Sequence, residues 1–180
     1  SGVHTDPRLK FFQEKHFKIV KGLIPVADQN PILTQLKLLM NDLEDLLQGV
    51  MALKELSLQS KDLIVSFGER CSSILVGAIL QQHLDKVEVI NSANYIVTDS
   101  QFGNAQVHLE QTNSNLQSLK EQLKTSVLVV TGFIAANEES RMTTLGRGGS
   151  DYTASLIGAA LVADAIEIWR DVDGVMIAAS

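Results

Sequence analysis

The chain has 180 residues, the length of one domain or of part of a larger one. Its 15 lysine and arginine residues against 21 aspartate and glutamate residues give a formal net charge of −6. Nucleic-acid grooves and anionic membrane surfaces need a basic excess, so we expect neither as a partner. Hydrophobic residues make up 45% of the chain and charged residues 20%, which excludes a disordered chain and indicates a packed core.

Signals for export or membrane insertion are not evident in the sequence. We expect no membrane span, because no apolar run approaches the ~18 residues that a span needs. Residues 1–6 have neither the cationic nor the apolar region of a signal peptide. The single cysteine, Cys71, excludes an internal disulfide and fits a reducing compartment. These features predict a cytoplasmic protein.

The first half of the chain, residues 1–85, has the hydrophobic period of helices. Apolar residues recur at steps of three and four in segments 9–23, 36–53 and 60–83. We expect Asn30-Pro31 to open the second helix as a cap and a first-turn proline. The leucine seam of this helix spans fewer than three heptads, which is short for a coiled coil. The pattern favours a helical hairpin packed within the domain, with a partner-binding zipper as the alternative.

The second half, residues 86–180, changes to an alternation of strands and helices. Its expected elements are strands at 87–90, 126–130 and 166–169, a strand or extended loop at 94–98, and helices at 116–123 and 152–162. The β-branched run at 126–130 is typical of a strand buried on both faces. Strands and helices that alternate with short joints predict an α/β fold with a parallel sheet.

The densest chemical signal is the stretch 143–154, which has three glycines between positions 146 and 149. Glycines let backbone amides approach a ligand closely. We expect Ser150 to cap the helix that follows and Asp151 to lie in its first turn. Arg147 beside this helix start would form a site for a carboxylate or phosphate. The alternative is a flexible loop with a helix cap, and neither the Walker A nor the dinucleotide spacing is present.

Two further clusters could carry chemistry. Residues 169–175 follow the last predicted strand, where open α/β sheets bind ligands, although an Asp-Gly turn with two solvated carboxylates is the alternative. Residues 66–73 place a glycine and an acid in an apolar helix. Glycine there costs ~1 kcal/mol relative to alanine, so close packing or a ligand would explain it. The four histidines lack metal-ligand spacing, so no metal site is expected.

Taken in order, these clusters resemble the aspartate kinases of the amino-acid kinase superfamily. The similar blocks are Ser66-Phe67-Gly68-Glu69, Val130 to Ile134, Thr143 to Ala154 and Ile168 to Val175. The Asp-Val-Asp-Gly-Val wording and the helical first half most resemble the kinase part of bifunctional aspartokinase–homoserine dehydrogenases. The resemblance implies ATP-dependent phosphorylation of the side-chain carboxylate of L-aspartate, the entry to lysine, threonine and methionine biosynthesis. It also implies a partial amino-acid-kinase fold, mostly a parallel sheet with flanking helices, over residues 1–180.

The resemblance also implies roles for individual residues. Glu69 would meet the substrate α-amino group and Arg147 a substrate carboxylate, pairings that suit an acid with an ammonium and a planar fork with a carboxylate. Asp151 would organise the cations that bind phosphate. The implied substrate-binding residues are Ser66, Glu69, Thr144 and Arg147, the catalytic residues are Gly148, Gly149, Ser150 and Asp151, and the nucleotide-binding residues are Arg170, Asp171 and Met176. The implied cofactors are ATP and Mg²⁺, without an assigned protein ligand to the metal.

The chain also departs from the family pattern. The Lys-Phe-Gly-Gly-Thr/Ser-Ser strand, whose lysine contacts the transferring phosphate, the Phe-Gly-Ala-Lys element and the regulatory ACT domains are not in these 180 residues. Arg170 stands where the family usually has threonine. We therefore expect an internal part of a longer enzyme, or else a degenerate relative, that has no meaningful kinase activity by itself and self-associates, most plausibly as a dimer. The alternatives are another superfamily member, such as a glutamate or carbamate kinase, or a non-catalytic interaction module built from the first two helices.

Overall fold

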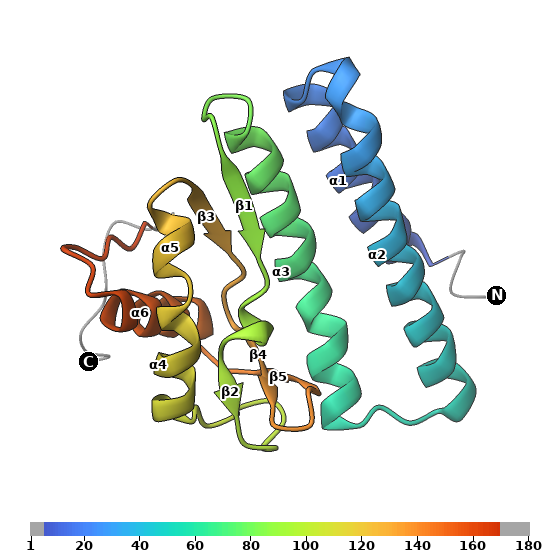
Figure 1. Cartoon of the computed structure of the whole chain (residues 1–180). Helices are drawn as coiled ribbons and strands as arrows, with labels where there is room; N and C mark the ends of the chain where they lie inside the picture. The colour runs from blue at the N-terminus through green and yellow to red at the C-terminus, as the bar shows by residue number, and fades with distance from the viewer. Residues whose placement is uncertain (1–5, 170–180) are drawn as a thin grey trace, which may run out of the picture.

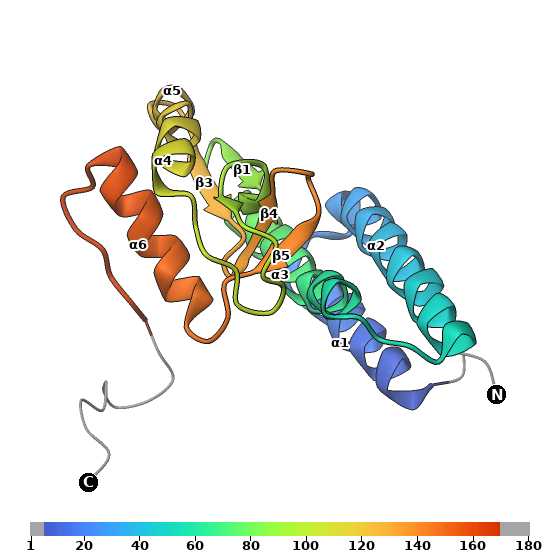
Figure 2. The same cartoon turned by 90° about the horizontal axis from the view of Figure 1, so that it is seen from below.

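The computed structural model describes residues 6–169. Arg170, Asp171 and Met176, the expected nucleotide contacts, therefore lie outside the described residues. Within the described residues, three long helices form the first half, and strands with three further helices form the second (Figure 1). Two small sheets lie between α3 on one side and α4 and α6 on the other, which confirms a mixed α/β fold (Figures 1 and 2).

Three helices pack side by side to form the helical layer. They are α1 (Pro7–Leu23), α2 (Val26–Leu53) and α3 (Leu58–Leu80). Asp6 caps α1 by accepting a hydrogen bond from the backbone of Arg8, and Ser57 caps α3 in the same way. A shared core joins the three helices, made of Val20, Ile24, Leu36, Met40, Cys71 and Leu75. The expectation that the helices pack within the domain is thus confirmed.

The start of α2 differs from the sequence prediction. The helix begins at Val26, and Pro31 lies inside it rather than at its first position. Pro25 adopts an extended conformation at the cap, and its carbonyl accepts the first turn's hydrogen bond from Asp28 N–H at 2.9 Å. Proline interrupts a helix by leaving the carbonyl four residues earlier without a partner. Here that carbonyl belongs to Ala27 in the first turn, where the loss disturbs little of the helix.

The central helix of the fold is α3, which packs against α2 on one side and against β1, β3 and β5 on the other. By length and composition alone, α3 could cross a membrane, whereas the sequence analysis expected no segment of this kind. Its apolar character has a local cause, because Phe67, Cys71 and Leu75 are buried between layers of the same chain.

The strands form two short sheets, of which the first is parallel. In it β1 (Val87–Ile90) pairs with β3 (Val127–Val130). The second has the order β2 (Val97–Thr98), β4 (Ile134–Asn137) and β5 (Met142–Thr144), with β2 parallel and β5 antiparallel to β4. The sheets are therefore mostly parallel as expected, but the antiparallel hairpin of β4 and β5 was not predicted. Nor is β3 buried on both faces, since its residues are exposed or half-buried.

The remaining helices correct the boundaries expected from sequence. A 3₁₀ turn, η2 (Ser92–Asn94), joins β1 to β2, and the helix expected at 116–123 is two helices, α4 (Leu109–Gln117) and α5 (Lys120–Leu123). The polar residues before position 116 lie inside α4 because Thr112 faces β2: its hydroxyl accepts from Val97 N–H at 3.0 Å.

The last helix, α6 (Gly149–Leu161), matches the expectation of a helix rich in small residues. The strand expected at 166–169 is not formed, because these residues pair with no strand among the described residues. Ile166 and Ile168 remain about half-exposed and Trp169 is 88% exposed. The apolar pattern that predicted a strand is therefore present without a partner to bury it.

Candidate functional site

The glycine-rich segment turns into α6 through a left-handed residue. Gly148 caps the helix with a φ of +76°, so the expectation that Ser150 is the cap is wrong. A residue with a Cβ adopts this φ only at a cost, whereas glycine adopts it freely. Ser150 lies within the first turn, and its exposed side chain is close to the bend that follows β3.

That bend, at Gly132 and Phe133, is held from two sides. Phe133 has a φ of +67°, unusual for a residue with a side chain. Its N–H donates to Thr153 Oγ1 at 3.1 Å, and its carbonyl accepts from Leu145 N–H at 2.9 Å. One hydrogen bond comes from α6 and the other from the end of β5, so the surrounding structure fixes the strained conformation.

The bend and the start of α6 are in close contact. A Cβ added to Gly132 would lie 2.9 Å from both Cβ and Oγ of Ser150, and one added to Gly149 would lie 2.9 Å from Cδ2 of Phe133. Thr153 joins the same contact, because its hydroxyl donates to the carbonyl of Gly149 at 2.9 Å. Two of the glycines are therefore required by the closeness of neighbouring atoms.

A cavity of about 440 Å³ opens where α3, the bend and α6 meet. It is lined by Glu69, Leu128, Val130, Gly132, Ser150, Thr153, Ala154, Ile157, Gly158, Ala163, Ala165 and Ile166. Glu69 is half-buried, and burial raises its pKa above the ordinary value, while a hydrogen bond from the backbone of Gly132 acts in the opposite direction. The cavity thus presents the acid of Glu69, the hydroxyls of Ser150 and Thr153, and an apolar wall.

The described residues nominated from sequence divide into three groups: those that line the cavity, those on the loop and first turn of α6, and those buried beside it. Glu69 and Ser150 line this cavity, and they come from α3 and α6. Arg147 and Gly148 are exposed on the loop before α6, and Arg147 is not among the described residues that line the cavity. Gly149 is buried and Asp151 is half-buried in the first turn of α6.

Ser66 and Thr144 form the third group, which is buried and bonded within the protein. The hydroxyl of Ser66 donates to the carbonyl of Leu63 at 2.7 Å, one turn back along α3. The hydroxyl of Thr144 donates to the carboxyl of Asp62 at 2.8 Å. Neither residue is among the described residues that line the cavity, and both hydroxyls are bonded within the protein.

Asp62 is the residue that sequence reasoning missed. Its side chain is 2% exposed, and its carboxyl group accepts three hydrogen bonds, from the backbones of Gly103 and Thr144 and from the Thr144 hydroxyl. The available signal was its position seven residues before Glu69, two turns away on the same face of a helix. An acid on the buried side of an apolar helix needs partners.

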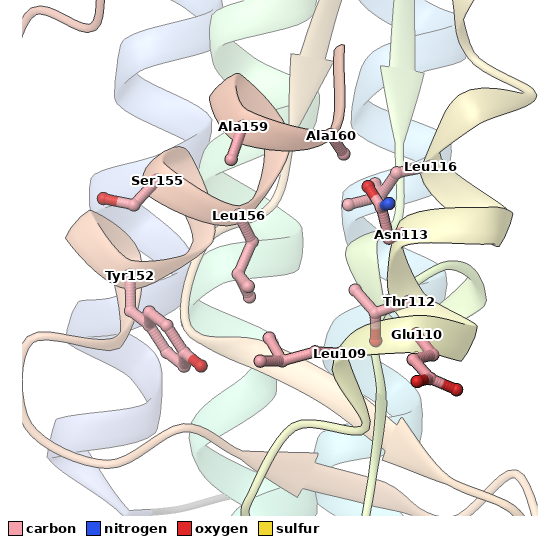
Figure 3. A pocket seen from close by; sticks show the side chains of 10 residues that line it. All are labelled: Leu109, Glu110, Thr112, Asn113, Leu116, Tyr152, Ser155, Leu156, Ala159 and Ala160. Carbon is pink, nitrogen blue, oxygen red and sulfur yellow. The ribbon is translucent and has the colours of Figure 1, made fainter. Parts of the chain in front are cut away.

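A second cavity of about 480 Å³ lies between α4 and α6 (Figure 3). Leu109 and Leu156 point into it from the two helices, and Glu110 lies at the α4 side (Figure 3). None of the described residues that line it was nominated from sequence. Among residues 6–169, no group of three or more His, Cys, Asp or Glu side chains is placed to hold a metal ion.

Comparison with known proteins shows the family to which the chain belongs. The profile of the Amino acid kinase family matches residues 16–179. The chain therefore belongs to the amino acid kinase family.

Within that family, the similar proteins are aspartokinases. The chain is 43% identical over 181 residues to aspartokinase 3, chloroplastic, of Arabidopsis thaliana, covering 98% of this chain and 31% of that protein. It is 33% identical over 136 residues to the bifunctional aspartokinase/homoserine dehydrogenase of Buchnera aphidicola, covering 75% of this chain and 16% of that protein. The structure of Escherichia coli aspartokinase III in complex with aspartate and ADP matches with a TM-score of 0.84 and 31% identity, covering 92% of this chain and 36% of that one. The chain thus spans about a third or less of these relatives.

Proposed function

We propose that this chain forms the amino-acid-binding part of an aspartate kinase, which transfers a phosphoryl group from ATP to the side-chain carboxylate of L-aspartate. The product would be 4-phospho-L-aspartate, for lysine, threonine and methionine biosynthesis. The observation that carries the proposal is the meeting of Glu69, Gly132 and Ser150 in one cavity. The similarity to aspartokinases supports it, including a structure described as a complex with aspartate and ADP.

The chemistry of the cavity suits a small zwitterion with two carboxylates. The acid of Glu69 would take the ammonium group, and the amides at the start of α6 with Ser150 would take a carboxylate, because a helix N-terminus favours an anion. Arg147, on the exposed loop that leads into α6, would supply a planar cation to a carboxylate once the substrate is bound. We retain Gly148, Gly149 and Asp151, which lie at this helix start, as the proposed catalytic residues.

ATP with Mg²⁺ would supply the phosphoryl group and the cationic charge that its transfer needs. The start of α6 fits an anionic group, because Gly148 has open space where a Cβ would stand. The contribution of this chain is to hold the amino acid: Glu69 fixes its ammonium end, and the α6 amides fix a carboxylate. Positioning of this kind accounts for a large share of catalysis in phosphoryl transfer.

Two further features belong to the proposal. We place the protein in the reducing cytoplasm, because its single cysteine, Cys71, is a free thiol and the chain has no disulfide of its own. We also propose that the chain forms a dimer, since α2 exposes Leu38, Met51 and Leu53, apolar side chains that a second copy could cover.

Titration of the purified chain with L-aspartate by calorimetry tests the proposed function. Glu69→Gln keeps the shape of the side chain and removes its charge, so we expect at least about a tenfold rise in Kd from the loss of a charge-assisted bond. Glu110→Gln, in the cavity between α4 and α6, is the matched control and should leave the Kd unchanged. Equal Kd values for the wild type and Glu69→Gln would contradict the assignment. Tighter binding of L-glutamate than of L-aspartate would instead favour another member of the superfamily.

A further inference from the structure

Asp62 joins three parts of the chain that are distant in sequence. It projects from α3, its Oδ2 atom accepts from Gly103 N–H at 2.8 Å and from Thr144 N–H at 3.0 Å, and its Oδ1 atom accepts from Thr144 Oγ1 at 2.8 Å. Every one of these contacts is buried or half-buried. A carboxylate suits these three donors, because both of its oxygens accept hydrogen bonds and, when ionised, it has no donor of its own.

The contact extends from Asp62 to the loop that carries Arg147. Ala105 N–H donates to the carbonyl of Thr144 at 2.9 Å, so the segment 103–105 holds Thr144 on its other side. The side chain of Asn104 packs directly against Gly146, leaving no room for a Cβ there. Gly146 has a φ of +72° and immediately precedes Arg147. The backbone on which Arg147 is placed is therefore set by the group of contacts centred on Asp62.

The same helix carries Asp62 and Glu69. Seven residues along a helix are two turns, roughly 10 Å at 1.5 Å per residue, and return to the same face. Asp62 meets the end of β5 from this face, and Glu69 meets the cavity two turns further on. Any change in how β5 sits on α3 would therefore move the segment 145–150 relative to Glu69.

We propose that Asp62 is a positioning residue for the amino-acid site, fixing the Leu145–Ser150 segment against α3 and so against Glu69. The inference rests on the proposed function in one respect only, namely that this segment and Glu69 hold the same substrate. Asp62 does not line the cavity and acts through Thr144, Gly103 and the loop beyond them. A buried donor that loses its acceptor carries the full cost of desolvation, so the loop would leave its place when the carboxyl group is altered.

Two substitutions test the proposal by removing different halves of the same contact. Asp62→Asn keeps the shape but turns an NH₂ group toward one or more of the three donors. Thr144→Val keeps the shape of threonine and removes its hydroxyl, and Thr144→Ser restores the hydroxyl. We expect about a tenfold rise in the Kd for L-aspartate in Asp62→Asn and Thr144→Val, and a value within about twofold of wild type in Thr144→Ser.

A stability control separates positioning from general destabilisation. Leu36→Val removes a methylene from the helical core away from the site, and it should lower the unfolding midpoint without changing the Kd. If Asp62→Asn behaves like Leu36→Val, with a lower midpoint and an unchanged Kd, the positioning role is overturned. Loss of binding in Thr144→Ser equal to that in Thr144→Val would overturn it as well.

Amide hydrogen exchange on the chain without substrate provides the second readout. We expect amides 145–150 to exchange about tenfold faster in Asp62→Asn while amides in α1 and α2 keep their wild-type rates. Unchanged exchange at 145–150, or an equal acceleration throughout the chain, would contradict the proposal. Because exchange needs no ligand, it decides the positioning role even if the wild type binds no L-aspartate, a result that would contradict the proposed function alone.

Discussion

The glycines around the site serve two physical needs that their clustering in the sequence does not distinguish. Gly148 is required by its backbone, since φ is +76° and nothing lies where a Cβ would be. Gly132 and Gly149 are required by their neighbours, since an added Cβ would meet Ser150 or Phe133 at 2.9 Å. The glycines were expected to let the backbone approach a ligand closely. In the structure, Gly132 and Gly149 instead let the bend and α6 pack closely against each other.

The ionisation of Glu69 should make the free energy of unfolding depend on pH. Its pKa is raised above the ordinary 4.5, chiefly by burial, so the native state holds its proton to a higher pH than the unfolded chain does. Stability from this group therefore falls as pH rises from about 4.5 through the raised value. Glu69→Gln removes the titration, so we expect a flatter dependence of the unfolding free energy on pH from 4.5 to neutrality. Urea unfolding at a series of pH values measures it, and a slope equal to that of the wild type would contradict the assigned burial.

At the scale of elements, the helical layer takes its stability from one face of α2. Leu36 is 0% exposed in the core shared by three helices, whereas Leu38, two positions along the same helix, is 59% exposed. At a concentration where the chain is monomeric, we expect Leu36→Ala to reduce the unfolding free energy by about 2–5 kcal/mol, and Leu38→Ala to change it by less than about 0.5 kcal/mol. Urea unfolding of the two variants checks this, and equal losses would mean that Leu36 is not in a packed core.

The elements differ in how well local pattern predicts them, and the reason is the origin of their stability. The helices over 9–23 and 60–83 and the strands at 87–90 and 127–130 are predictable, because their apolar residues recur with a regular period or form a continuous run. Thr112 and its polar neighbours precede the helix expected at 116–123 yet lie in α4, because the Thr112 hydroxyl bonds the backbone of β2. Such a bond depends on tertiary contact, which local pattern does not contain.

The part of the candidate site that could be predicted from the sequence consists of residues whose type and local neighbours indicate a chemical role. Glu69, an acid next to a glycine in an apolar helix, and Ser150, at a helix start, do lie on one cavity. Asp62 was not singled out, since its importance comes from Thr144, 82 positions away in the sequence. The three-residue strand β5, which brings Thr144 to α3, is too short to show a hydrophobic period of its own.

At the scale of the whole molecule, the site belongs to neither half of the chain alone. The helical half contributes Asp62 and Glu69, and the α/β half contributes Gly132, Thr144 and Ser150. The two halves meet along α3, which lies between α2 and the strands (Figure 2). Binding in the cavity should therefore change the environment of residues in both halves, in the elements that border the cavity.

Amide chemical shifts of the isotope-labelled chain during titration with L-aspartate test whether the amino acid binds in the cavity between α3 and α6. We expect saturable shifts at Gly132, Phe133, Gly149 and Ser150 and in α3 around Glu69, with little change in α1. Shifts that instead gather on α4 and α6 around Leu109 and Leu156, or no saturable shifts at all, would contradict it.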